Sequence, residues 1–175
     1  LGSSVGIHKI KNEKEFPAGL KDAFLYDTKI VIEENIKGRE IECSVLGNED
    51  PIASIPGEII PNADFYSYNS KYIDNKSISK IPAELSKDTT KKIQDMAVKV
   101  FKVLNCEGMG RVDFFLKDTG EILVNEINTL PGFTAISMYP KMWEVSGLPI
   151  SKLLDRLIEF AILRFKREQK LKSNV

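Results

Sequence analysis

The stretch GRVDFFLKDTGEILVNEIN, residues 110–128, contains two β-rich runs on either side of a turn signal. Residues 112–117 and 122–127 are rich in β-branched and aromatic side chains, which favour strands. Thr119-Gly120 lies between the two runs, and glycine tolerates the positive φ that tight hairpin turns require. The stretch therefore predicts a β-hairpin.

The register of this hairpin would decide which side chains meet. A two-residue loop would place three polar pairs opposite each other: Asp118 and Glu121, Asp113 and Glu126, and Arg111 and Asn128. Paired residues share a face of the sheet, and successive residues alternate between its two faces. The side chains of the last two pairs are therefore expected on one face. The other face would carry apolar side chains: Val112, Phe114, Leu116, Leu123 and Ile127.

The polar face has the composition of a metal site. Facing carboxylates such as Asp113 and Glu126 repel each other unless a positive group lies between them. Together with the Asn128 amide they offer only oxygen ligands, which suit Mg²⁺ with waters or substrate phosphates in its other positions. Arg111 could bind phosphoryl oxygens or a developing oxyanion. A hairpin with merely solvated charges is the alternative, but four residues in register, followed at once by NTLPG at 128–132, favour a site.

Length, charge and cysteine content set broad limits. A chain of 175 residues is one ordinary domain, or one domain plus part of another. Its 25 basic and 25 acidic residues balance, so no global field favours nucleic acid or an acidic membrane surface. Cys43 and Cys106 are too few for a disulfide framework and fit a reducing cytoplasm. We find no apolar run of membrane-spanning length and no secretory signal.

The rest of the chain predicts helices and strands without strict alternation, which favours the α+β class. Helices are expected at 12–26, at 86–105 with Ser86 or Asp88 as the cap, and from about Ser151 to about Lys170. Strands are expected at 29–34, at 40–46 and, around Pro56-Gly57, at 52–60. Residues 61–82 are polar and irregular with several aromatics, a combination typical of a lid or binding loop. The start, LGSSVG without a Met, leads us to expect a fragment of a longer protein.

Taken together, these residues resemble the D-alanine–D-alanine ligases of the ATP-grasp superfamily. The resemblance runs through six motifs in order: LGSSVGI at 1–7, Glu33-Glu34, GRE at 38–40, FYxYxxKY at 65–72, GRxD at 110–113 and NExNTxPG at 125–132. The metal triplet alone would indicate only ATP-grasp. The Gly-Ser-Ser loop, Lys71-Tyr72 and Ser137 narrow the resemblance to this ligase family.

The resemblance implies a reaction and a domain plan. ATP would phosphorylate the carboxylate of one D-alanine, and the amine of a second would attack the acyl phosphate to give the D-alanyl-D-alanine used in peptidoglycan. Residues 1–40 would be a remnant of the central ATP-grasp subdomain. Residues 41–175 would be the C-terminal subdomain, with the lid at 61–82 and the metal hairpin at 110–128.

The resemblance also implies roles at the reacting centre. Asp113, Glu126 and Asn128 would hold two Mg²⁺ (or Mn²⁺) ions along the ATP phosphates. Arg111 and the backbone N–H of Gly132 would stabilise the tetrahedral oxyanion. Ser137 would bind the carboxylate of the second D-alanine, and Met138 would line the pocket of that substrate. Tyr72 would form a hydrogen bond with Ser3 as the lid closes.

A second group of residues would bind the nucleotide. Glu33 would accept from the adenine amino group, and the backbone of Ile36 would pair with the ring edge. Glu40 would take the ribose hydroxyls, Tyr66 would pack near the base, and Lys71 would reach the transferred phosphoryl group.

The resemblance further favours D-alanine as the second substrate. Lys71-Tyr72 is the pattern that D-lactate-using relatives lose, and the apolar Met138 argues against a D-serine pocket. Because the family's N-terminal domain and its upstream phosphate-binding lysines are missing, we expect the 175 residues alone to be inactive. The parent enzyme would be bacterial, cytoplasmic and homodimeric, with no nucleic-acid or membrane partner. Two alternatives stay open: an ATP-grasp ligase with other substrates, and a non-catalytic nucleotide- or metal-binding module.

Overall fold

The computed structural model of this chain describes residues 4–60, 78–134 and 136–171. The chain divides into two compact units, residues 1–37 with 60–78 and residues 38–59 with 79–175. The division at residue 40 that the family resemblance implies remains a prediction. Four predicted site residues lie outside the described residues: Ser3, Tyr66, Lys71 and Tyr72. The predicted lid at 61–82 also falls mostly outside them.

Among its described residues, the first unit contains one short helix, α1, at Phe16–Ala23. It lies inside the helix predicted at 12–26, with Pro17 in its first turn, where a missing N–H costs nothing. Glu15, directly before the helix, accepts hydrogen bonds from the Lys11 N–H at 2.9 Å and from Asn12 Nδ2 at 2.7 Å. The strand predicted at 29–34 is wrong, because a strand needs a hydrogen-bonded neighbour and this run pairs with none among the described residues.

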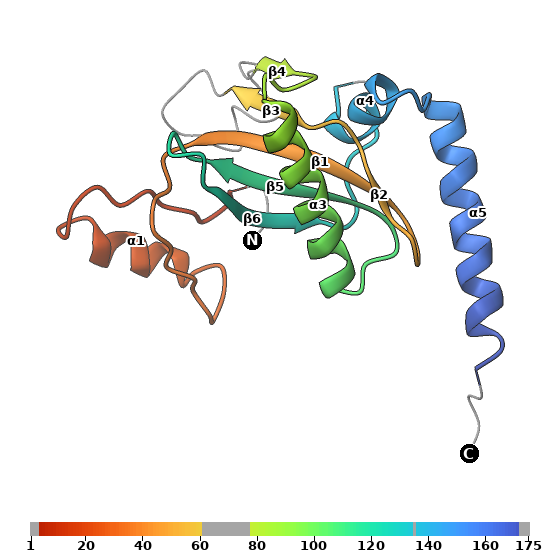
Figure 1. The fold of residues 1–175 in the computed structure, drawn as a ribbon. Helices are drawn as coiled ribbons and strands as arrows, with labels where there is room; N and C mark the ends of the chain where they lie inside the picture. Colours follow the sequence, from red (N-terminus) through yellow and green to blue (C-terminus); the bar gives the residue numbers. More distant parts are fainter. Residues whose placement is uncertain (1–3, 61–77, 135, 172–175) are drawn as a thin grey trace. The chain divides into compact units, whose positions relative to one another are not determined.

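The second unit is built on a six-stranded sheet in the order β4-β3-β1-β5-β6, with β2 paired to β1 off this path (Figure 1). The strands are β1 Arg39–Gly47, β2 Ile52–Ala53, β3 Gly57–Ile60, β4 Ile78–Lys80, β5 Gly108–Leu116 and β6 Ile122–Asn128. Strand β1 runs antiparallel to β2, β3 and β5, and β5 runs antiparallel to β6. Two long strands, β1 and β5, therefore pair at the centre of the sheet, and the α+β prediction is confirmed.

Helix α3, Lys87–Val103, crosses one face of this sheet (Figure 1). Its cap is Ser86 rather than Asp88, because the Ser86 Oγ accepts from the Thr89 N–H at 3.1 Å. The helix buries Ile93, Ala97 and Phe101. These side chains pack in one core with alternate residues of the two central strands: Ile41, Cys43, Val45, Val112, Phe114 and Leu116.

Helices α4, Met138–Val145, and α5, Ile150–Glu168, pack in a second core that includes Leu46, Tyr139, Trp143 and Leu153. The sequence did not predict α4, whose Pro140 lies in the first turn, where proline is tolerated. The helix expected from about Ser151 starts at Ile150, and Pro149, not a serine, holds its extended N-cap position. Within the described residues, no helix combines the length and apolar character needed to cross a membrane.

The end of β1 depends on a glycine. Gly47 has a φ of 140°, and a Cβ added there would lie 2.8 Å from the Pro51 Cα. We expect Gly47→Ala to lower the free energy of unfolding by about 3 kcal/mol, since backbone strain and a clash with main chain add together. Denaturant unfolding of the full-length protein measures this loss.

Gly120 provides the matched control. Its φ is 85°, but a Cβ added there meets nothing within 4 Å in the described structure. Gly120→Ala should therefore cost only the left-handed backbone penalty of about 1–2 kcal/mol. Equal losses for the two variants would contradict the steric argument at Gly47.

Candidate active site

The hairpin of β5 and β6 brings the predicted polar residues together. Arg111 lies opposite Asn128, and Asp113 lies opposite Glu126, so both predicted site pairs are confirmed. The predicted two-residue loop is wrong. The Lys117 N–H donates to the Glu121 carbonyl oxygen at 2.9 Å, so three residues, Asp118 to Gly120, form the loop. Gly120 takes the positive φ that such loops need at their last position.

A β-bulge restores the register that the longer loop shifts. The pairing slips between Asp113 and Phe114, so Phe114 lies opposite Val124 and Asn125 is the extra residue of β6. Between the bulge and the loop, the alternation of β6 is therefore inverted relative to the prediction. Leu123 pairs with Phe115 on the polar face, not on the core face where it was expected, while Ile122 packs against the core.

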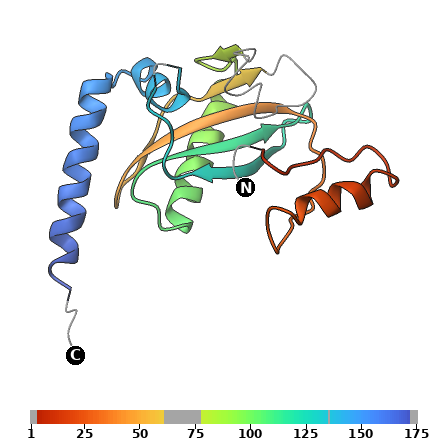
Figure 2. The same cartoon turned by 180° about the vertical axis from the view of Figure 1, so that it is seen from behind.

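Strand β1 adds a third residue in register to each of the two polar pairs. Ser44 lies opposite Arg111, and Glu42 lies opposite Asp113. Glu42, Asp113 and Glu126 therefore form one row of carboxylates across three adjacent strands, which we call the carboxylate row. Because the alternate residues of β1 and β5 pack with α3, the row lies on the face away from that helix, the face seen in Figure 2.

The Arg111 side chain is held inside the carboxylate row. Its Nε–H and Nη2–H donate to the two carboxylate oxygens of Asp113, each at 2.7 Å. Its Nε also lies 3.3 Å from Glu42 Oε2, and the side chains of Arg111 and Glu42 are only 19% and 12% exposed. Burial lowers the pKa of Arg111, but the hydrogen bond to Asp113 and the charges of Glu42, Asp113 and Glu126 outweigh it and raise that pKa above its usual value. Arg111 is therefore a permanent cation.

One guanidinium does not balance three carboxylates. Carboxylates that outnumber the guanidinium beside them are a favourable environment for a bound cation. Asp113, Glu126 and Asn128 supply oxygen donors from neighbouring pairs, which fits Mg²⁺. No group of three or more His, Cys, Asp or Glu in the described ranges is arranged to hold a metal ion by itself. The donor set therefore suits a cation that takes its remaining ligands from phosphates and water.

The segment after β6 brings Gly132 and Ser137 together. The Ser137 Oγ accepts from the Thr134 N–H at 3.0 Å and lies 2.8 Å from the Thr134 Oγ1. A Cβ added at Gly132 would lie 2.9 Å from the same Ser137 Oγ. The missing side chain at Gly132 therefore allows this close approach.

Met138 follows at the start of α4 and lies over β3. Its Cε would be 2.5 Å from a Cβ added at Gly57, so the glycine makes room for the methionine. Gly57 pairs with Glu42 across β1 and β3. Met138 is therefore placed beside the carboxylate row, as a residue lining a substrate pocket there would need to be.

The residues predicted to bind the nucleotide are described less completely. Glu40 lies on β1 two residues before Glu42 and shares its face of the sheet. Glu33 is exposed and Ile36 is half-buried, and both belong to the first unit. Their roles, like those of the residues outside the described ranges, remain predictions.

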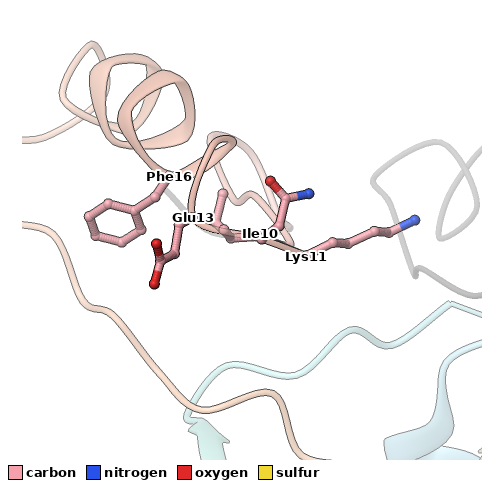
Figure 3. Close-up of a pocket in the computed structure, with 5 residues that line it drawn as sticks. Ile10, Lys11, Glu13 and Phe16 are labelled. Carbon is pink, nitrogen blue, oxygen red and sulfur yellow. The ribbon is translucent and has the colours of Figure 1, made fainter.

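Two other features carry no chemistry of this kind. Burial raises the pKa of the Cys43 thiol to about 12, so this residue is a core side chain and not a nucleophile. An open hollow in the first unit is lined by Ile10, Lys11, Asn12, Glu13 and Phe16, and Figure 3 shows Lys11 extending away from Phe16. None of the predicted site residues lines it.

Sequence reasoning missed one member of the site, Glu42. A signal was present, because Glu40 was already a candidate and strand alternation places the residue two positions later on the same face. What the sequence lacked was the pairing of β1 with β5, which the fold provides.

Comparison with known proteins gives one consistent family. The family model described as D-ala D-ala ligase C-terminus matches residues 1–159. The D-alanine–D-alanine ligase of Oceanobacillus iheyensis is 59% identical over 174 residues, which cover 99% of this chain and 48% of that protein. This chain therefore spans about half the length of the curated relative.

Solved structures agree with the sequence comparison. The D-alanine–D-alanine ligase of Coxiella burnetii has a TM-score of 0.87 at 51% identity, over 97% of this chain and 45% of that one. The D-alanine–D-alanine ligase of Bacillus anthracis complexed with ATP has a TM-score of 0.77 at 36% identity, over 95% and 53%. The fold, the polar hairpin and these matches lead to one conclusion: the chain belongs to the D-alanine–D-alanine ligase family and has the ATP-grasp fold of its C-terminal part.

Proposed function

We propose that the parent protein joins two D-alanines at the expense of ATP, with the carboxylate row and Arg111 at the centre of the site. ATP transfers its γ-phosphoryl group to the carboxylate of the first D-alanine and leaves as ADP. The amine of the second D-alanine attacks the carbonyl carbon, loses a proton, and expels phosphate. The observation that carries this proposal is the pairing of Arg111-Asn128 and Asp113-Glu126 beside Glu42 on one face.

Asp113, Glu126 and Asn128 would hold two Mg²⁺ (or Mn²⁺) ions, because their oxygens are grouped where the charge balance is negative. When bound, such ions offset the charge of the nucleotide phosphates and orient them. The support for a nucleotide is the similarity to a relative whose structure is complexed with ATP.

The chain's own residues would then act on the reacting carbonyl. Arg111 supplies a fixed positive charge for the developing oxyanion, and it is held in place by two carboxylates before any substrate arrives. The Gly132 N–H adds a second donor. Ser137 binds the carboxylate of the second D-alanine, and Met138 makes an apolar contact with the methyl group of that D-alanine.

The nucleotide and the lid complete the site. Glu40 binds the ribose hydroxyls, while Glu33 and the Ile36 backbone bind adenine. The residues outside the described ranges keep the roles that the family resemblance implies: Tyr66 near the base, Lys71 on the phosphoryl group, and Tyr72 bonding Ser3. Closure of such a lid would exclude water, which hydrolyses acyl phosphates. We further propose a homodimer in the cytoplasm for the parent protein.

Phosphate release tests the proposal. The full-length protein with Mg²⁺ and ATP should release phosphate when D-alanine is added and not when L-alanine is added. Product analysis with D-alanine plus D-serine or D-lactate identifies the second substrate, and D-alanyl-D-alanine is expected to dominate. Phosphate release with an unrelated carboxylate and amine, but not with D-alanine, would favour another ATP-grasp ligase.

The 175 residues alone should not ligate. Half of the relatives' length lies outside this chain, and the proposed site needs phosphate and substrate contacts from it. The same assay on this polypeptide, at concentrations where the full-length protein is active, should give no dipeptide. Turnover by the isolated chain would contradict the proposed division of the active site.

A further inference from the structure

Glu42 is a buried carboxylate beside a guanidinium that Asp113 also holds. It lies directly opposite Asp113 on the neighbouring strand, and its Oε2 is 3.3 Å from the Arg111 Nε. The two Asp113 oxygens take the shorter bonds from the same guanidinium, each at 2.7 Å. Arg111 is therefore held between two carboxylates that belong to different strands.

The sheet contains a second Glu–Arg pair, in which the glutamate is largely buried and the arginine is partly exposed. Arg39 donates to both oxygens of Glu58 at 2.7 and 2.6 Å, a complete fork between β1 and β3. Glu58 lies opposite Ile41, and Glu42 lies opposite Gly57, so the two glutamates are on opposite faces of the sheet. Both carboxylate oxygens of Glu58 therefore accept hydrogen bonds from Arg39, on the core face of the sheet. The Glu42 Oε2 approaches the Arg111 guanidinium at 3.3 Å, whereas the Asp113 oxygens bond to it at 2.7 Å.

This sharing has a consequence once Asp113 binds a cation, as in the function proposed above. A cation on the Asp113 oxygens competes with the guanidinium for the same lone pairs, so the fork from Arg111 weakens. Glu42 then becomes the carboxylate that still holds the Arg111 Nε. Without it, a buried guanidinium would face the cations with no fixed counter-charge and would move away from them.

We propose that Glu42 is a positioning residue that keeps Arg111 at the reacting carbonyl while Asp113 serves the cation. Glu42 acts through Arg111 and does not itself touch the substrate. The inference rests on the proposed function, because it needs Asp113 to be a cation ligand.

A double-mutant cycle in the full-length protein tests this role. Glu42→Gln keeps the shape of the side chain and removes its charge, and Glu42→Asp keeps the charge and withdraws it from Arg111. Glu58→Gln is the matched control, because Glu58 is also a largely buried glutamate that pairs with an arginine, on the other face of the sheet. Each variant is made alone and in combination with Arg111→Ala. For each we measure kcat, KM for both D-alanines, Mg²⁺·nucleotide affinity by calorimetry, and the thermal midpoint.

The expected result separates positioning from folding and from metal binding. Glu42→Gln should lower kcat by roughly tenfold to a hundredfold, and Glu42→Asp should lower it less. Mg²⁺·nucleotide affinity should stay within about twofold of wild type. In the Arg111→Ala background, Glu42→Gln should change kcat by no more than about twofold, because Glu42 affects the reaction through Arg111. Glu58→Gln should lower the thermal midpoint without lowering kcat in this way.

Three results would overturn the role. An undiminished effect of Glu42→Gln in the Arg111→Ala background would show that Glu42 acts independently of Arg111. A loss of Mg²⁺·nucleotide affinity of about tenfold or more in Glu42→Gln, as expected when a metal ligand is removed, would make Glu42 a metal ligand. Equal behaviour of Glu42→Gln and Glu58→Gln would make it a structural residue only. A wild-type protein without D-alanine-dependent phosphate release would refute the proposed function itself, and this role with it.

Discussion

Replacing Arg111 with alanine is expected to lower kcat of the full-length enzyme by roughly 10²–10³-fold, the usual cost of removing one oxyanion donor. The guanidinium is held by Asp113 and Glu42 before substrate binds, so its charge is already present at the proposed site. The loss should appear mainly in kcat, because the oxyanion exists only after the amine attacks. Steady-state phosphate release at saturating D-alanine measures it.

Two further variants make the Arg111 result specific. Arg111→Lys keeps a charge but cannot form the fork to Asp113, so it should recover little of the lost kcat. Arg39→Ala removes a guanidinium from the opposite face of the sheet and should reduce stability while sparing kcat. An Arg111→Ala enzyme within about twofold of the wild-type kcat would exclude the oxyanion role.

Asp113→Asn should cost even more, because Asp113 has two functions in this account. Its carboxylate is a proposed cation ligand, and both of its oxygens accept from Arg111. An amide has one acceptor oxygen and presents its NH₂ group to the guanidinium, so the fork is lost together with the charge. We expect kcat below that of Arg111→Ala and a Mg²⁺ requirement raised on the order of a hundredfold or more.

Titration of activity with Mg²⁺ at fixed ATP measures both effects of Asp113→Asn. Asp118→Asn is the control, an aspartate in the loop of the same hairpin and away from the carboxylate row. It should leave kcat and the Mg²⁺ requirement unchanged. A normal Mg²⁺ requirement in Asp113→Asn would argue that the carboxylate only positions Arg111.

The hairpin shows how far local sequence signals reach. Turn chemistry predicted the correct partners for Arg111 and Asp113, although the predicted loop was one residue too short. The bulge at Asn125 offsets that residue, and no local signal distinguishes the bulge from a regular strand. The site pairs were therefore predicted correctly, while the placement of Leu123 was wrong.

Other differences come from interactions that are distant in sequence. The run at 29–34 has strand composition but no strand neighbour among the described residues, and composition alone cannot supply one. Helix α4 is short and contains a proline, and the Oγ of its N-cap residue Ser137 accepts from the Thr134 N–H instead of from the first turn of the helix. Glu42 reached the site only through the pairing of β1 with β5.

The most direct test of the central claim is calorimetric titration of Mg²⁺ and a non-hydrolysable ATP analogue into the full-length protein and its Asp113→Ala and Glu126→Ala variants. These residues face each other across β5 and β6 and are the proposed cation ligands. Both variants should keep their thermal unfolding transition and lose Mg²⁺-dependent nucleotide binding. Binding of the wild-type strength in both folded variants would contradict the assignment of the carboxylate row as the cation and phosphate site.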